Sequence, residues 1–202
     1  MFDPLLEELN HSLLQRGGEL VNVPFPFGEC ESLKGESKIR SWLWKVPNFR
    51  RWRVTRLDAG SKLQVLNSVA YPNYSNDLPI LGIDLLWFQN TQKLVAVLDF
   101  QPLTQDPDYF ERYFSGLKSL KNKLSVFNSN VDMTIYNPSQ YFSPWVLFYK
   151  GGVDKFTISL SDVFISFLNC YWDLVNKLPM NKCQYEQKTV KRLQISYDKY
   201  SA

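Results

Sequence analysis

Histidine is almost absent from this sequence. Only His11 occurs among the 202 residues, and it falls within a helical pattern near the start. A metal centre built on several histidines, a Ser-His-Asp triad or a Cys-His pair in the core is therefore not expected. The glycine-rich signatures GxGxxG and GxxxxGKS are also missing, so no standard loop for a dinucleotide or a phosphate is present. Any chemistry must rest on carboxylates, amides and aromatic rings, or on groups that a substrate and a partner supply.

Cysteine is scarce as well. Cys30, Cys170 and Cys183 are odd in number and widely spaced, which favours reduced thiols in a cytoplasmic compartment over a disulfide framework or a metal knuckle. No apolar run is long enough to cross a bilayer, and the N-terminal segment has early acidic residues, unlike a secretory signal. We therefore expect a cytoplasmic protein without a membrane partner. The net charge of +3 is too small to imply nucleic acid by itself, although it would suit an acidic protein partner.

The composition is that of a well-packed globular domain. Hydrophobic residues make up 45% of the chain and aromatic residues 15%, which is enough apolar surface for a sizeable core. A length of 202 residues predicts one domain spanning 1–202.

Helical patterns surround a central block of strand patterns. A leucine stripe over residues 5–14 predicts a helix that ends at Gly17-Gly18, followed by a loop over 19–35 and a short helix over about 37–44. Four strands are predicted at 52–58, 62–71, 80–89 and 93–101, and the short turn sequences between them indicate antiparallel hairpins. Helices are predicted at 106–124, 161–178 and 185–201, with one more strand at 141–152. Because two strands are apolar on both faces, we predict an α/β (α+β) fold with layers on both sides of a mainly antiparallel sheet.

Asp84 is the first candidate for chemistry. It lies within the apolar run LGIDLLWF, and strand alternation places it on the same face as Gly82, Leu86 and Phe88. A desolvated carboxyl group has a raised pKa, so it can stay protonated near neutral pH and donate a proton. A buried aspartate that is hydrogen-bonded to a loop explains the pattern about equally well.

Two further polar residues interrupt apolar strands. Asp99 lies near the end of its strand, where capping of a turn is the favoured interpretation. Asn67 interrupts the run VLNSV, and a cross-strand hydrogen bond is favoured over a ligand contact.

The segment FRRWRVTR (49–56) combines arginines with aromatic residues. This pattern fits single-stranded nucleic acid, the carboxylates of a ligand or an acidic protein surface. An ordinary strand with exposed arginines is at least as well supported.

Four longer stretches resemble the ferredoxin-dependent bilin reductases, and the resemblance extends over essentially the whole chain. They are residues 41–60, 63–88, 93–103 and 140–152, and the most specific part is N-S-V-A-Y-P-x-Y-x-x-D-x-P-x-x-G-x-D, which runs from Asn67 to Asp84. The resemblance implies a three-layer α/β/α sandwich around a central antiparallel sheet, with biliverdin IXα between the sheet and C-terminal helices. It also implies no bound cofactor and no metal, with single electrons from reduced ferredoxin and protons from the protein.

The resemblance assigns roles to particular residues. Asp84 matches the family's catalytic aspartate, and Asn67 stands where reductases that make phycocyanobilin carry a histidine. An asparagine there fits reduction of the bridge between the C and D rings, which yields 15,16-dihydrobiliverdin for phycoerythrobilin synthesis. Gln101 matches a pocket position near the bilin, and Lys150 matches a basic residue that holds a propionate. A second bilin reductase that receives the product is a further expected partner.

The resemblance also carries an expectation about the end of the chain. The family continues past the equivalent of Ser201-Ala202 into a segment with a second aspartate and helices that close the pocket. We therefore expect a bilin reductase domain without that segment. A protein that binds bilin without turnover is the alternative function, and a nucleic-acid module using residues 49–56 is the least favoured.

Overall fold

The computed structural model describes residues 1–127, 142–156, 159–177, 183 and 185–201, with the side chains of residues 198–201 left out. The described residues form one eight-stranded sheet in the order β1-β3-β4-β5-β6-β7-β8, with β2 pairing to β3. Every pairing is antiparallel. The strands are β1 (Glu19–Val21), β2 (Glu29–Glu31), β3 (Lys38–Lys45), β4 (Phe49–Asp58), β5 (Gln64–Pro72), β6 (Ile80–Phe88), β7 (Lys93–Gln101) and β8 (Leu147–Gly152).

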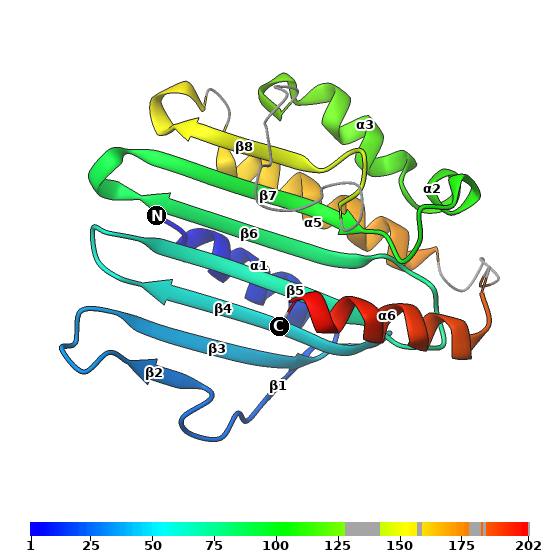
Figure 1. The fold of residues 1–202 in the computed structure, drawn as a ribbon, viewed down its shortest axis with the longest axis horizontal. Coiled ribbons are helices and arrows are strands. Elements are labelled where there is room, and N and C mark those ends of the chain that lie inside the picture. The colour runs from blue at the N-terminus through cyan, green and yellow to red at the C-terminus, as the bar shows by residue number, and fades with distance from the viewer. Residues whose placement is uncertain (128–141, 157–158, 178–182, 184, 202) are drawn as a thin grey trace.

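Helices cover both faces of this sheet (Figure 1). On one face, here called the back face, lie α1 (Asp3–Gln15), α2 (Pro107–Tyr113), α3 (Ser115–Lys123) and α5 (Leu160–Asn176). On the other, the front face, α6 (Gln187–Ser201) crosses part of the middle strands. Short 3-10 turns follow β6, α3 and β8, at Gln89–Thr91, Ser125–Phe127 and Val153–Lys155. The described residues therefore confirm the three-layer α/β/α prediction with a mainly antiparallel sheet.

The back face holds the densest packing. Trp52 of β4 stacks on Trp172 of α5, with ring centroids 5.1 Å apart, and Trp172 Nε1 donates to Ser12 Oγ of α1 at 2.8 Å. Phe100 of β7 packs against Tyr171 of α5, whose hydroxyl donates to the Pro79 carbonyl at 2.8 Å. Since buried aromatic rings contribute large apolar areas and specific ring contacts, this layer makes the sheet a rigid support for its front face.

The helix predicted over residues 37–44 is wrong, because this segment is β3. It pairs along β4 from Lys38↔Asp58 to Trp44↔Trp52, after a tight reversal in which Asn48 adopts a φ of +71°. Pairing with a neighbouring strand determines the conformation of such a segment, and this pairing cannot be read from its local residue pattern.

Other element predictions need smaller corrections. The loop over 19–35 contains the short strands β1 and β2. The helix over 106–124 is two helices that meet at Phe114, although Asp106 caps the first through a 3.0 Å bond from the Asp108 amide. The strand predicted over 141–152 begins at Leu147, and residue 141 lies outside the described residues.

All three cysteines are free thiols. Within the described ranges, no helix combines the length and the apolar character needed to span a membrane.

Candidate functional site

Strand register places all four predicted site residues on the front face. Asn67 of β5 pairs with Asp84 of β6, and Asp84 pairs with Val97 of β7. Gln101 lies opposite Ile80, four residues along β7 from Val97, and Lys150 of β8 lies opposite Val95. Strand partners lie on the same face of a sheet, and so does every second residue along a strand. These four side chains therefore leave the sheet on the same side. The predicted alternation around Asp84 is therefore confirmed.

The front face around Asp84 is apolar but less covered than the back face. Five hydrophobic side chains surround the row of Asp84 and are only partly buried: Val65, Leu86, Val95, Val97 and Phe148. On the same strands, back-face residues such as Leu66, Leu85 and Leu98 are completely buried. Apolar side chains with a few polar groups among them are the usual lining of a ligand site.

Asp84 is held by one neighbour within the described part of the chain. Asn67 Nδ2 donates to Asp84 Oδ1 at 3.4 Å, and Asn67 Oδ1 accepts from Arg53 Nη2 of β4, also at 3.4 Å. Burial raises the pKa of the Asp84 carboxyl, and the Asn67 amide partly opposes this by lowering it. The cross-strand bond predicted for Asn67 is present, and its partner is Asp84 itself. Burial therefore favours the neutral, protonated form of this acid, which is the form that can donate a proton.

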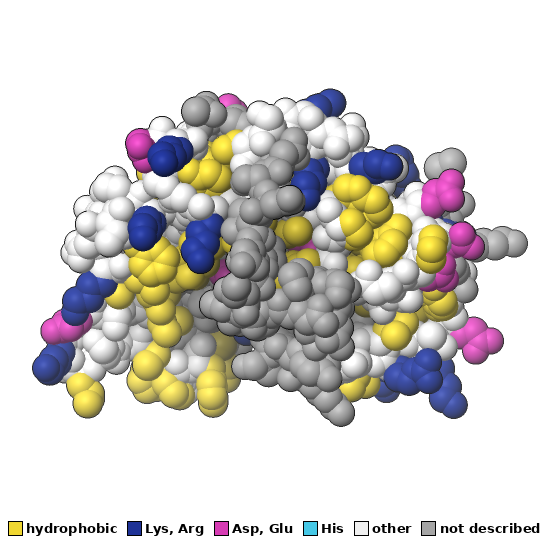
Figure 2. Space-filling model, turned by 45° about the horizontal axis from the view of Figure 1, so that its top comes forward, with side chains coloured by type: hydrophobic (Ala, Val, Ile, Leu, Met, Phe, Trp, Pro, Cys, Tyr) yellow, Lys and Arg dark blue, Asp and Glu magenta, His cyan; other side chains and the backbone are white. Residues whose placement is uncertain are grey.

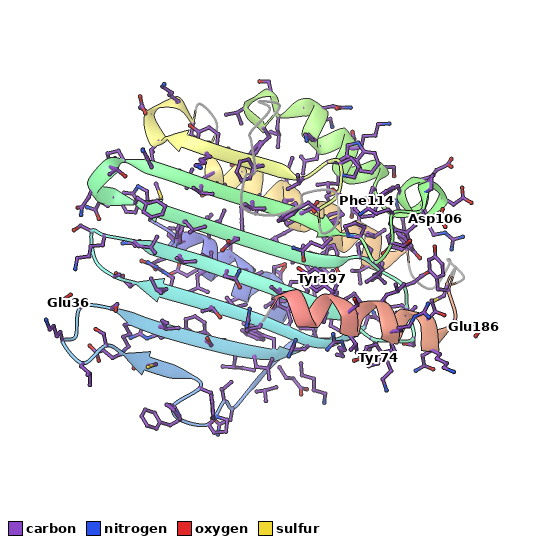
Figure 3. The ribbon with its side chains drawn as sticks, in the orientation of Figure 1. Glu36, Tyr74, Asp106, Phe114, Glu186 and Tyr197 are labelled. Atoms are coloured by element: carbon purple, nitrogen blue, oxygen red, sulfur yellow. The ribbon has the colours of Figure 1, made fainter. Side chains whose placement is uncertain are left out.

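Gln101 connects the sheet to α6. Its side chain lies over Gly82, where an added Cβ would come within 2.8 Å of Gln101 Nε2, so the glycine makes room for the amide. Gln101 Oε1 accepts from the hydroxyl of Tyr197, which reaches the sheet from α6 (Figure 3). Tyr197 also packs edge-on against Tyr71 of β5 at 6.3 Å. Gln101 is therefore at the side of the front face where α6 begins to cover it.

Sequence patterns did not single out Gln194, although it lies in the same layer. It is completely buried, and its Oε1 accepts from Arg50 Nε at 2.8 Å. Its Nε2 has no hydrogen-bond partner within the described residues, so a buried donor is available between α6 and the sheet. The sequence does hold a signal for it. Gln194 follows Val190 by four residues and precedes Tyr197 by three, so the helical period places it on the same inward face as those two residues.

Asp99 also lies on the front face, opposite Gly82, but it is fully buried. Its carboxyl accepts from the Ser143 amide at 2.7 Å and from the Ser143 hydroxyl at 2.5 Å. Burial raises the pKa of Asp99 to about 8, although both bonds from Ser143 lower it. The carboxyl therefore has a structural role, as predicted, but its side-chain partner is a distant segment that leads into β8 and not the turn at the end of its own strand.

Lys150 is exposed, and no described carboxylate pairs with its ammonium group. Its strand lies two strands from β6, or about 10 Å at ordinary strand spacing. This distance suits a contact with the periphery of a ligand whose centre lies near Asp84.

The basic segment 49–56 is divided between the two faces. Arg53 bonds to Asn67 on the front, and Arg51 stacks on Tyr71 at 4.4 Å. Arg56 is buried on the back and pairs with Asp3 at 3.3 Å. On the face of the molecule that Figure 2 shows, the described Lys and Arg side chains lie at separate places rather than in one patch. This arrangement disfavours the nucleic-acid interpretation, which needs a continuous basic groove.

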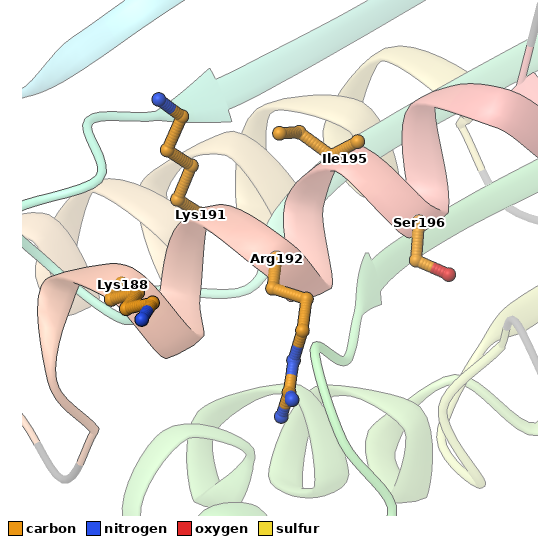
Figure 4. Close-up of a pocket in the computed structure, with 5 residues that line it drawn as sticks. All are labelled: Lys188, Lys191, Arg192, Ile195 and Ser196. Atoms are coloured by element: carbon orange, nitrogen blue, oxygen red, sulfur yellow. The ribbon is translucent and has the colours of Figure 1, made fainter.

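A shallow hollow follows the outer side of α6 (Figure 4). Its lining residues are Lys188, Lys191, Arg192, Ile195 and Ser196. It lies on the side of the helix opposite to Gln194 and Tyr197, and it is therefore separate from the front-face site.

Comparison with known proteins identifies the family. The profile of the ferredoxin-dependent bilin reductase family matches residues 6–202. The chain belongs to the ferredoxin-dependent bilin reductases. It is therefore an oxidoreductase, and the family resemblance seen in the sequence is confirmed.

Individual bilin reductases are similar over the full chain. A protein of Prochlorococcus marinus (strain NATL1A) named 15,16-dihydrobiliverdin:ferredoxin oxidoreductase is 56% identical over 202 residues, which are 100% of this chain and 85% of that protein. A protein of the same name from Synechococcus sp. (strain CC9902) is 54% identical, over 100% of this chain and 86% of the relative. The crystal structure of tomato phytochromobilin synthase in complex with biliverdin shares the fold, with a TM-score of 0.74 and 17% identity over 96% of this chain and 69% of that one.

Proposed function

We propose that this bilin reductase converts biliverdin IXα to 15,16-dihydrobiliverdin, with Asp84 as a proton donor. The family supports ferredoxin-dependent reduction of a bilin. The names of the relatives that are 50–56% identical support reduction of the 15,16 bridge. The observation that carries the role of Asp84 is its place as a partly buried acid, bonded only to Asn67 among the described residues, in the middle of a half-covered apolar face.

The reaction adds two electrons and two protons to one double bond. Ferredoxin donates electrons one at a time, so the proposed course passes through a bilin radical. Asp84 supplies one of the two protons and is reprotonated from water. Burial raises the pKa of Asp84, which favours the protonated form that this role needs.

The other front-face residues receive binding roles in this proposal. Asn67 and Gln101 provide amide groups that orient the bilin, and Lys150 holds a propionate at the periphery. The bilin lies flat on the apolar side chains between them, which accounts for their partial exposure. No bound cofactor or metal takes part in the proposed reaction. The product passes to a second bilin reductase that takes 15,16-dihydrobiliverdin as its substrate.

The test compares Asp84→Asn with wild type in anaerobic assays with biliverdin and reduced ferredoxin. We expect the variant to bind biliverdin normally, to accumulate the radical, and to form product about 10²–10⁴-fold more slowly, as for loss of a general acid. Asp173→Asn is the matched control, because Asp173 lies on the exposed side of α5. Wild-type turnover in Asp84→Asn contradicts the proton-donor role.

The same assay tests the remaining parts of the proposal. The absorption spectrum of the wild-type product distinguishes reduction at the 15,16 bridge from reduction elsewhere. A bound bilin that never bleaches in the presence of reduced ferredoxin supports the alternative, a binding protein without turnover.

A further inference from the structure

Arg53, Asn67 and Asp84 come from three neighbouring strands and share the front face. Asn67 of β5 lies directly opposite Asp84 of β6, whereas Arg53 of β4 lies opposite Val69 and therefore diagonal to Asn67. Arg53 Nη2 donates to Asn67 Oδ1, and Asn67 Nδ2 donates to Asp84 Oδ1. Both distances are 3.4 Å, at the long end of the hydrogen-bond range. Both hydrogen bonds are therefore weak, and the important property of this group of residues is which atom donates and which accepts.

The amide of Asn67 could face Asp84 in two ways, with opposite effects. If Nδ2 points to Asp84, the amide donates to the carboxylate and cannot accept the acid's proton. If Oδ1 points there, the protonated acid donates to Asn67, and its proton is directed into the sheet layer instead of toward a ligand. The choice between these orientations depends on the neighbour at the other end of the amide.

That neighbour is an arginine, which has donors only and stays charged. An arginine can bond to Asn67 only through Oδ1, and this leaves Nδ2 for Asp84. We propose that Arg53 is a positioning residue that fixes the Asn67 amide with its NH₂ group toward Asp84, so that the proton of Asp84 is directed to the substrate. This proposal rests on the proposed role of Asp84 for its catalytic consequence, but the orientation effect itself does not.

Several other charged or titratable groups share the front face. Asp99 lies opposite Gly82, Lys150 lies on β8, and Tyr197 reaches the face from α6. Among the described residues only Asn67 is hydrogen-bonded to Asp84, and its amide lowers the pKa that burial raises. An effect of Arg53 on Asp84 should therefore pass through Asn67.

The decisive measurement is the titration midpoint of Asp84. It is monitored through the infrared carbonyl band of the protonated acid, which is assigned to Asp84 because Asp84→Asn removes it. We expect Arg53→Met to raise this midpoint, because the freed amide can turn and accept the proton of the neutral acid. Arg51→Met is the matched control: it removes an equal charge from the same face and strand, at a residue that stacks on Tyr71. It should leave the midpoint where it is in wild type, and Arg53→Lys, which keeps a donor-only cation, should stay close to wild type.

A double-mutant cycle separates orientation from a direct effect of charge. In the Asn67→Ala background, Arg53→Met should cause no further change in the midpoint. In turnover assays, Arg53→Met should lower kcat by about tenfold, the factor that corresponds to one hydrogen bond. It should also move the alkaline limb of the pH profile of kcat to higher pH.

Two results would overturn the inference: an unchanged midpoint in Arg53→Met, or an equal shift in the presence and absence of Asn67. Normal turnover of Asp84→Asn would instead refute the proton-donor role. The midpoints would still decide whether Arg53 orients the amide, so the two failures are distinguishable.

Discussion

The carboxyl group of Asp99 makes the stability of this protein depend on pH in an unusual direction. Burial raises its pKa from 3.8 to about 8 in the folded protein, whereas in the unfolded chain it is near the ordinary value. Between these two values the folded state binds one proton more than the unfolded state. The contribution of Asp99 is therefore greatest at low pH, and it is lost as the pH rises toward 8.

The magnitude follows from one proton. The slope is about 1.4 kcal/mol per pH unit, so the free energy of unfolding should fall by about 3 kcal/mol between pH 5 and 7 because of Asp99 alone. Asp99→Asn removes this dependence. At pH 5 the carboxyl is protonated and, like the amide, has one C=O oxygen to accept from Ser143, so the variant should be within about 1 kcal/mol of wild type. By pH 7 the variant should be the more stable protein by about 3 kcal/mol, because only wild type loses the contribution of the proton.

The assay is urea unfolding of both proteins at several pH values, read as the difference between their free energies. Asp84 is present in both chains, so its own contribution cancels to first order. Asp173→Asn, which removes an exposed carboxyl group from α5, is the matched control. A constant difference for Asp99→Asn would refute the reasoning: it would mean that the two bonds from Ser143 keep the carboxyl ionised in spite of burial.

Two further predictions concern the edges of the site. Lys150→Met should weaken biliverdin binding by about 2–5-fold, as for loss of an exposed ion pair, and leave kcat unchanged. The measurement is a titration with biliverdin, and the control is Lys155→Met, at another exposed lysine. Equal affinities of the two variants would show that Lys150 does not hold the propionate. Tyr197→Phe removes the hydrogen bond to Gln101 and should speed hydrogen exchange in α6. The free energy of opening this helix should fall by about 0.5–1.5 kcal/mol, the net contribution of one hydrogen bond. Tyr74→Phe is its control, because the Tyr74 ring contacts cations but its hydroxyl has no described hydrogen bond; similar exchange in both variants would show that the Gln101 bond does not hold α6.

Local patterns predicted the strands around the site well. The segments at 52–58, 62–71, 80–89 and 93–101 are β4 to β7 within a few residues, and short turns made their antiparallel pairing predictable. The period of two along a strand also placed Asp84 on the correct face. Prediction failed at β3, where the segment has no clear alternation of its own and pairing with β4 decides the conformation.

The sequence by itself determined the class of the protein, the central hairpins and the identity of Asp84 as an isolated acid in an apolar strand, because these depend on residues close together in the chain. Only the tertiary structure decided what surrounds that acid. Arg53, Asn67 and Asp84 come from three strands, and their contact depends on the register between strands. Tyr197 is 96 residues from Gln101 and meets it only because α6 crosses the front face. Burial and hydrogen-bond partners are properties of such distant contacts, and they decide whether a carboxyl group supports the fold, as Asp99 does, or is placed to donate a proton, as we propose for Asp84.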